Sequence, residues 1–218
     1  MDDILTGDIT CPHCRQNSPF VYHPFVDSVD HPDLKAQCMT GEIFAFTCQH
    51  CGKRARIGYP LVYHDGAART LILAFPERDI AEARKLLEAL ADKGNVDLAG
   101  YSLRVAAQPP ILAEKIFLLD QGLDDRIIEL YKRALTPAVK MDWGNRPIRL
   151  AMLTDHEGMH FLFFLEDHPL PVILPFERET YETMRGQYAP FFPTGTDANL
   201  FVDQQWAEDF MHPGGVIQ

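Results

Sequence analysis

The chain has 218 residues, of which 46% are hydrophobic and 23% charged, and its 20 basic and 31 acidic side chains give a net charge of −11 at pH 7. This composition is typical of a globular protein and excludes intrinsic disorder, a collagen-like fibre and a coiled coil. The longest apolar runs, residues 71–75 and 161–165, are far shorter than the roughly 20 residues of a membrane helix.

Residues 8–75 favour short strands. Pro, Gly, Asn and Asp separate four apolar or alternating segments, a spacing that indicates a small antiparallel sheet. The expected strands are residues 20–22, 43–47, 57–63 and 70–75. Residues 31–35, which begin with His-Pro-Asp, predict a single helical turn between the first two strands.

The middle of the chain predicts helices. Residues 79–93 form the clearest one, because their apolar side chains share one face and Asp79 with Glu82 forms a capping box. Gly94 is expected to end this helix in the position that favours glycine. A strand and two further helices are expected over residues 101–106, 112–120 and 124–135.

The last third predicts a β-meander with flanking helices. Residues 137–147 contain two prolines, a glycine and Trp143, and are interpreted as a connector. The strands that follow are expected over residues 148–153, 159–165 and 172–176, and the helices over residues 177–187 and 199–211.

Two C-x-x-C pairs carry the strongest chemical signal. Cys11 and Cys14 are separated from Cys48 and Cys51 by 33 residues. A C-x-x-C turn holds two sulfurs on one side of a tight loop, so two such turns, brought together by strand pairing, predict a tetrahedral four-cysteine zinc site. Gly52 suits the positive φ that such a turn often needs. Because four thiolates leave no open coordination position, the zinc is expected to be structural rather than catalytic.

Other residues near these pairs have alternative interpretations. His13 and His50 occupy matching positions inside the pairs, but adjacent ligands cannot both reach one ion without strain, so both are interpreted as non-ligands. Cys38 is interpreted as a small buried hydrophobic residue rather than a redox thiol. A thiol redox sensor is a weaker alternative for the whole cluster, because oxidation of zinc-bound thiolates releases the metal.

The residues around the cysteine pairs resemble the CpXC domain of bacterial proteins. The sequence Ile-Thr-Cys-Pro-His-Cys at residues 9–14 is similar to the opening that names the family. Further similar segments, which extend the resemblance over roughly residues 8–135, are 44–52, 63–65, 112–116 and 122–126. The resemblance implies zinc bound by the four cysteines; it supplies no reaction, because the family has no assigned activity. Arg15 stands where these turns often carry glycine.

Residues 156–160 spell His-Glu-Gly-Met-His, the H-E-x-x-H pattern of zinc proteases. In such an enzyme His156 and His160 share one helical face and Glu157 acts as general base. The surrounding pattern favours a hairpin, with Gly158 in its turn. A zinc-dependent hydrolase that uses these residues is therefore the alternative function, and no catalytic residue is assigned.

His64 and Asp65 are also weighed as an orienting pair. Asp65-Gly66 is a strong hairpin signal, so a turn is favoured.

Charge and the N-terminal residues bear on partners and location. Lys53, Arg54 and Arg56 are interpreted as a solvated edge of an acidic chain, although a nucleic-acid-binding zinc ribbon is a third possible class. The acidic N-terminus lacks the cationic and apolar regions of a secretory signal, which predicts a cytoplasmic protein with reduced thiols. The expected function is a non-catalytic zinc-binding module with a protein partner, acting on neither membrane nor nucleic acid.

The predicted fold class is α+β. It combines a small antiparallel sheet and a zinc-ribbon-like four-cysteine site with helices and a C-terminal β-meander flanked by helices. The predicted domains are a CpXC-like zinc-binding domain over residues 1–136, with its sheet over 8–75 and its helices over 77–136, and a C-terminal α+β domain or subdomain over residues 148–218.

Overall fold

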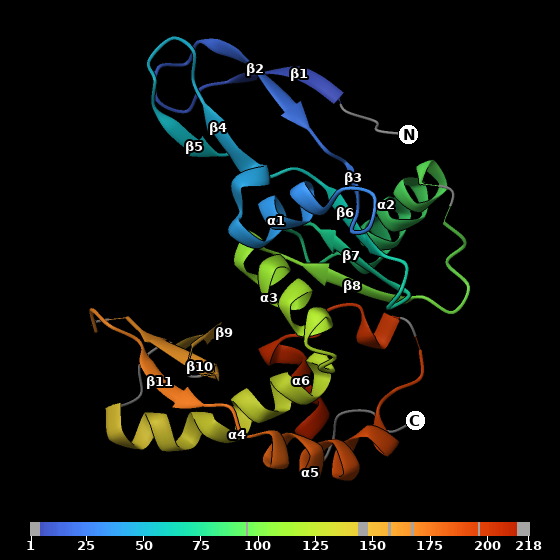
Figure 1. Cartoon of the computed structure of the whole chain (residues 1–218), viewed down its shortest axis with the longest axis vertical. Coiled ribbons are helices and arrows are strands. Elements are labelled where there is room, and N and C mark those ends of the chain that lie inside the picture. The colour runs from blue at the N-terminus through green and yellow to red at the C-terminus, as the bar shows by residue number, and fades with distance from the viewer. Residues whose placement is uncertain are drawn as a thin grey trace. The chain divides into compact units, whose positions relative to one another are not determined.

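The computed structural model describes residues 5–94, 96–143, 148–156, 158–166, 168–195 and 197–212. The chain forms two compact units, each containing helices and strands (Figure 1). The units are Met1–Phe117 with Thr196–Phe201, and Leu118–Gly195 with Val202–Gln218. This mixture of elements confirms the α+β class. The division into domains over residues 1–136 and 148–218 stays a prediction. Separate expression of the two parts would test whether each folds independently.

Two short antiparallel ribbons carry the cysteine pairs at their turns (Figure 1). Their strands are β1 (Leu5–Thr10) with β2 (Asn17–Tyr22), and β4 (Ala45–Thr47) with β5 (Arg54–Arg56). Aromatic side chains pack between the ribbons: the ring centroid of Phe20 lies 6.2 Å from that of Phe46 and 5.8 Å from that of Tyr59. The ribbons therefore share one small apolar core.

A four-stranded sheet in the first unit has the strand order β3-β6-β7-β8. Its strands are β3 (Phe25–Asp27), β6 (Leu61–Asp65), β7 (Thr70–Ala74) and β8 (Ser102–Ala106). The pair β6–β7 is antiparallel, but β3–β6 and β7–β8 are parallel, so this sheet is mixed rather than purely antiparallel. Parallel neighbours need long connections. Helix α1 (Pro32–Thr40) and the second ribbon connect β3 to β6, and α2 (Ile80–Lys93) connects β7 to β8.

Helix α2 packs its apolar face on this sheet, as its 3.6-residue periodicity predicts. The buried side chains that meet there include Leu71, Leu73, Leu87, Leu90 and Val105. The predicted cap is confirmed, because the Asp79 carboxylate accepts a hydrogen bond from the Glu82 N–H at 3.0 Å.

Gly94 ends α2 at the predicted residue, but for a different reason. Its φ of −78° is helical rather than left-handed. A Cβ at this position would lie 2.5 Å from Cζ of Phe25, closer than real Cβ contacts. The approach of the Phe25 ring, rather than the backbone conformation, therefore favours glycine here.

Two expected strands are shorter than predicted. The strand expected over residues 43–47 begins within a 3-10 helix, η1 (Glu42–Phe44), because Gly41 adopts a φ of 75° and redirects the chain before β4. The strand expected from residue 57 begins only at Leu61, since Tyr59 packs into the aromatic core of the ribbons. The single helical turn expected at residues 31–35 extends to the nine residues of α1.

The prediction of a connector over residues 137–147 is wrong for residues 137–143, which are helical, and its remainder, residues 144–147, lies outside the described residues. After α3 (Pro109–Asp120), helix α4 (Asp125–Trp143) continues through Pro137. A proline inside a helix removes one backbone hydrogen bond. The buried side chain of Val139 compensates by extending the apolar face of α4 beyond the proline. Packing therefore outweighs local propensity here.

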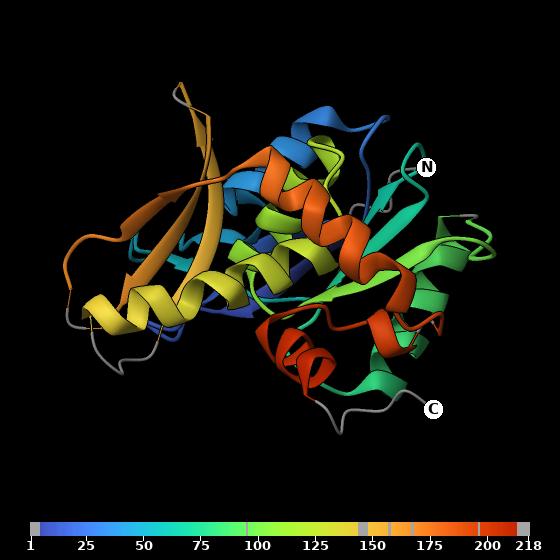
Figure 2. The same ribbon diagram turned by 90° about the horizontal axis from the view of Figure 1, so that it is seen from below.

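The C-terminal meander is confirmed, with strand order β11-β10-β9. Its strands are β9 (Ile148–Asp155), β10 (Gly158–Leu165) and β11 (Val172–Pro175). Helix α4 runs beside it (Figure 2), and the ring centroids of Tyr131 and Phe161 lie 4.8 Å apart. The flanking helices are α5 (Arg178–Tyr188) and α6 (Gln204–Met211); α6 starts later than predicted, because Asp203 caps it.

Short 3-10 helices, η2 (Ala189–Phe191) and η3 (Asp197–Asn199), complete the secondary structure of the described residues. Across those residues, each helix is too short or too polar to cross a membrane.

Candidate metal centre

The two C-x-x-C segments fold into equivalent turns. The Arg15 N–H donates to the Cys11 carbonyl at 2.9 Å, and the Gly52 N–H donates to the Cys48 carbonyl at the same distance. In each turn the N–H of the first cysteine also donates to the carbonyl five residues further on. One turn geometry is thus used twice, once at the tip of each ribbon.

The residue after each pair adopts a left-handed conformation. Gly52 has a φ of 68°, as the sequence led us to expect, and Arg15 has a φ of 62°. Non-glycine residues adopt this conformation at some energetic cost. The departure at Arg15 therefore leaves the turn geometry unchanged and places a small strain in the first turn.

The turns bring the four cysteine sulfurs that the spacing singled out into one cluster. All four Sγ atoms lie within 4.8 Å of one another. The Sγ atoms of Cys11 and Cys51 are 3.8 Å apart, and those of Cys14 and Cys48 are 3.6 Å apart. Sulfurs bound at about 2.3 Å around a tetrahedral zinc ion are about 3.8 Å apart. The donor set and its spacing fit such an ion.

Hydrogen-bond donors favour the thiolate forms of two cysteines in this cluster. The Ser18 hydroxyl lies 3.5 Å from Sγ of Cys48. Hydrogen bonding by Ser18, together with backbone N–H groups, lowers the pKa of the Cys48 thiol to about 5. Hydrogen bonds from the backbone N–H groups of Cys14 and His13 likewise lower the pKa of Cys11.

The pKa of Cys14 is shifted in the opposite direction, because its sulfur lies close to the other three. The Gln16 N–H favours its thiolate, but desolvation and the three neighbouring sulfurs raise the pKa of this thiol to about 12. Four negative charges cannot share so small a volume without a cation. A bound divalent ion would offset this repulsion and keep all four thiols deprotonated.

The remaining candidates lie outside the cluster. Nε2 of His50 pairs with the Asn17 carbonyl at 2.9 Å, and His13 takes part through its backbone N–H, which donates to Cys11 Sγ at 3.4 Å. Cys38 is fully buried in α1, and burial raises the pKa of its thiol to about 12, as suits a small hydrophobic residue. The described residues hold no other cluster of three or more histidine, cysteine or acidic side chains placed to share an ion.

No pattern in the sequence singles out Ser18. It lies in β2, where it alternates with exposed neighbours, and it is buried against Cys48. A buried serine in a strand resembles any other small core residue, so only the fold shows its role beside the sulfur.

A family model described as CpXC protein matches residues 9–132. The match spans more than half of the chain and includes both cysteine pairs. The chain belongs to the CpXC family. Comparison with curated proteins and with solved structures finds no match. The CpXC match ends within α4, so the meander lies beyond it.

Outside the CpXC match, the H-E-x-x-H sequence lies in the predicted hairpin. His160 belongs to β10, where it is opposite Leu153 on one side and Pro175 on the other. Gly158 begins this strand with a φ of 127°. Glu157 lies outside the described residues. The helix that would align His156 with His160 is therefore replaced by a turn and a strand.

The basic cluster of the CpXC region is partly neutralised. Nη2 of Arg54 lies 2.6 Å from a carboxylate oxygen of Glu42 in an exposed ion pair, while Lys53 and Arg56 are exposed in the same ribbon. This pairing reduces the positive charge that the ribbon presents to solvent.

Proposed function

We propose that this CpXC protein holds a structural zinc ion through Cys11, Cys14, Cys48 and Cys51, and that it acts as a non-catalytic module that binds another protein. The observation that carries the metal assignment is the pair of equivalent turns with tetrahedrally spaced sulfurs. Four thiolates suit zinc, which needs no redox partner and accepts this geometry.

A structural role is supported by how little else stabilises the ribbons. Strands β4 and β5 have three residues each, too few for a stable isolated hairpin. Their shared core consists of a few aromatic side chains. In small modules of this kind a metal crosslink supplies the missing stability.

A protein partner is supported by the surface of the ribbons. Leu5 and Val21 lie on opposite faces of the first ribbon, each with about half of its surface exposed, at 49% and 46%. Such side chains suit a protein contact better than a phosphate backbone. The net charge of −11 also disfavours nucleic acid. Reduced thiolates require a reducing compartment, which supports the cytoplasm as the location.

Metal analysis of freshly purified protein tests this proposal. We expect one zinc ion per chain, retained on dialysis, and its loss in the double variant Cys48→Ser, Cys51→Ser. Cys38→Ala is the matched control, because it changes the cysteine outside the cluster and is expected to keep the metal. Absence of zinc, or a redox-active iron in its place, would contradict the proposal. A second, exchangeable zinc ion would instead favour the hydrolase at His156, Glu157 and His160.

The same variants test the partner. A protein captured by the wild type and by Cys38→Ala, but not by the double variant, would place binding in the zinc module. Equal capture by all three would place it elsewhere in the chain.

A further inference from the structure

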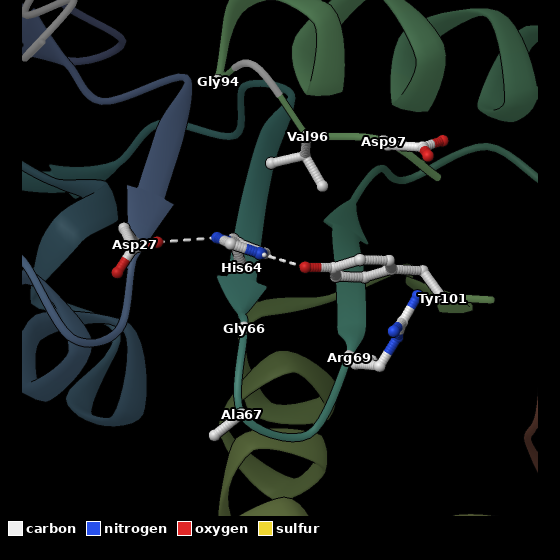
Figure 3. Close-up of a pocket in the computed structure, with 9 residues that line it drawn as sticks. All are labelled: Asp27, His64, Gly66, Ala67, Arg69, Gly94, Val96, Asp97 and Tyr101. Atoms are coloured by element: carbon white, nitrogen blue, oxygen red, sulfur yellow. Dashed lines mark hydrogen bonds and ion pairs between the residues drawn. The ribbon is translucent and has the colours of Figure 1, made fainter. Parts of the chain in front are cut away.

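Three polar side chains form a hydrogen-bonded row at one end of the four-stranded sheet (Figure 3). Nδ1 of His64, in β6, lies 2.6 Å from a carboxylate oxygen of Asp27, in β3. Nε2 of the same imidazole lies 3.0 Å from the hydroxyl of Tyr101, immediately before β8. The parallel register pairs Asp27 with His64, so the two side chains share one face of the sheet. This row is separate from the four-cysteine cluster.

The direction of the hydrogen bonds in the row follows from Asp27. Its Oδ1 accepts hydrogen bonds from the N–H groups of Val29 and Asp30, at 2.8 and 3.0 Å, and its Oδ2 faces His64. Although burial opposes them, these hydrogen bonds lower the pKa of Asp27, so the group is a carboxylate. A carboxylate can only accept, so His64 donates from Nδ1; in the neutral imidazole this leaves Nε2 to accept the Tyr101 O–H.

This order is that of an activated nucleophile. A hydroxyl donates to an imidazole, and a fixed carboxylate holds the imidazole in the correct tautomer. Here the hydroxyl belongs to a phenol rather than to a serine. The side chain of His64 is mostly buried, with 11% exposed, which limits competition from water for its ring nitrogens.

The row opens into a cavity of about 540 Å³, a volume suited to a small molecule. Gly66, Ala67 and Gly94 line part of it (Figure 3). The guanidinium carbon of Arg69 lies 5.4 Å from the centroid of that ring. Arg69 has a φ of 47°, a conformation that costs energy outside glycine and recurs at functional sites.

Charge indicates what could enter this cavity. Its described lining includes two carboxylates, from Asp27 and Asp97, and one guanidinium, from Arg69. Such a lining disfavours a multiply charged anion such as a phosphate ester and admits an uncharged compound. The Arg69 guanidinium lies by the Cβ end of the Tyr101 side chain, away from its hydroxyl (Figure 3), where its Nη2 donates to the Ala99 carbonyl at 2.6 Å.

We propose that Tyr101 is a nucleophile that accepts an acyl group from a small uncharged ester or thioester. The Tyr101 oxygen forms a bond to the acyl carbon while its proton passes to Nε2 of His64. The bond between the acyl carbon and the leaving group breaks, and the imidazolium returns the proton to that group. Water then cleaves the tyrosyl ester with His64 again as the base. Asp27 is a positioning residue, and the zinc site keeps its non-catalytic role.

Acylation by 4-nitrophenyl acetate tests this assignment on the full, zinc-loaded chain. We expect a burst of 4-nitrophenolate and acetylation of Tyr101, located by peptide mass mapping. Tyr188, whose ring packs against Phe210, is the internal control. Because a general base contributes 100-fold or more, Tyr101 should react about 100 times faster than Tyr188. Equal acetylation of the two tyrosines would overturn the proposal.

Three variants separate the roles. Tyr101→Phe should abolish the burst, and His64→Gln should slow acetylation of Tyr101 about 100-fold. Asp27→Asn should slow it and change its pH profile, because the imidazole loses the partner that fixes its tautomer. The zinc content and the unfolding midpoint of each variant are measured beside the burst. If the row is only structural, a variant that loses the burst should also lose stability; if Tyr101 is the nucleophile, the burst is lost while both controls stay unchanged. An unchanged burst in His64→Gln would refute the role of the imidazole.

Discussion

Arg15 and Gly52 adopt the same left-handed backbone conformation, with φ values of 62° and 68°, at equivalent positions after the two cysteine pairs. A long cationic side chain and a glycine thus perform the same task in the two halves of the four-cysteine cluster. The conformation is imposed by the turn, and glycine only lowers its cost.

Exchanging the residue types at these two positions should change stability in opposite directions. A Cβ at Gly52 would meet no atom within 4 Å, so Gly52→Ala isolates backbone strain and should destabilise the zinc-loaded protein by about 1 kcal/mol. Arg15→Gly relieves that strain and should be neutral or slightly stabilising. Chemical denaturation in the presence of zinc measures both; a loss in Arg15→Gly as large as that in Gly52→Ala would contradict this account.

Ser18→Ala should make zinc retention more sensitive to acid. Protons compete with the metal for the sulfurs, and the Ser18 hydroxyl helps to hold the pKa of Cys48 near 5. Without it the thiol is protonated at higher pH, so the midpoint of zinc release should rise by up to about one pH unit. Zinc release followed with a chromogenic chelator as the pH falls gives this midpoint. Thr10→Ala, on the exposed ribbon, is the control and should leave it unchanged.

Removal of zinc should unfold the ribbons. Structural zinc contributes roughly 10–16 kcal/mol of apparent binding free energy, which is comparable to the stability of a whole domain. Phe20, Tyr22 and Tyr59 pack edge to face in the ribbon core, so their near-UV circular dichroism should disappear on chelation and return with added zinc. A near-UV spectrum that survives complete chelation would show that the ribbons fold without the metal.

Pro137→Ala should stabilise α4. A proline in a helix interior costs up to about 3 kcal/mol relative to alanine, and the helix around Pro137 is already formed. The proline leaves the Arg133 carbonyl without its α-helical N–H donor, which alanine restores, so a gain of about 1–2 kcal/mol is expected. Thermal denaturation would report it as a higher midpoint, and an unchanged or lower midpoint would argue against it.

Local patterns predicted the elements whose cause is local. The spacing of the cysteines anticipated the cluster, the capping box anticipated the start of α2, and Gly158 anticipated the hairpin before Met159. The helix predicted for this region ends at residue 135, because the helix propensity of proline is very low. In the fold the helix continues through Pro137, because the side chain of Val139 is buried beyond it.

The row at His64 could not be predicted, because its causes are not local. Asp27 ends a strand of only three residues, which no periodicity reveals. Asp27 meets His64, 37 residues further on, through a parallel register, and Tyr101 lies another 37 residues along the chain, immediately before β8. The sequence drew attention to Asp65 as the partner of His64, but the partner carboxylate comes from β3.

The Phe25 ring lies against two features that line the same pocket, the end of α2 and the His64 imidazole. One edge of it fills the space that a side chain at Gly94 would need, and its centroid lies 5.7 Å from that of the His64 imidazole. A single methyl group added at Gly94 would overlap this ring and force it to move. A change of shape at a helix terminus therefore alters the surroundings of the imidazole, with every polar group of the row left in place.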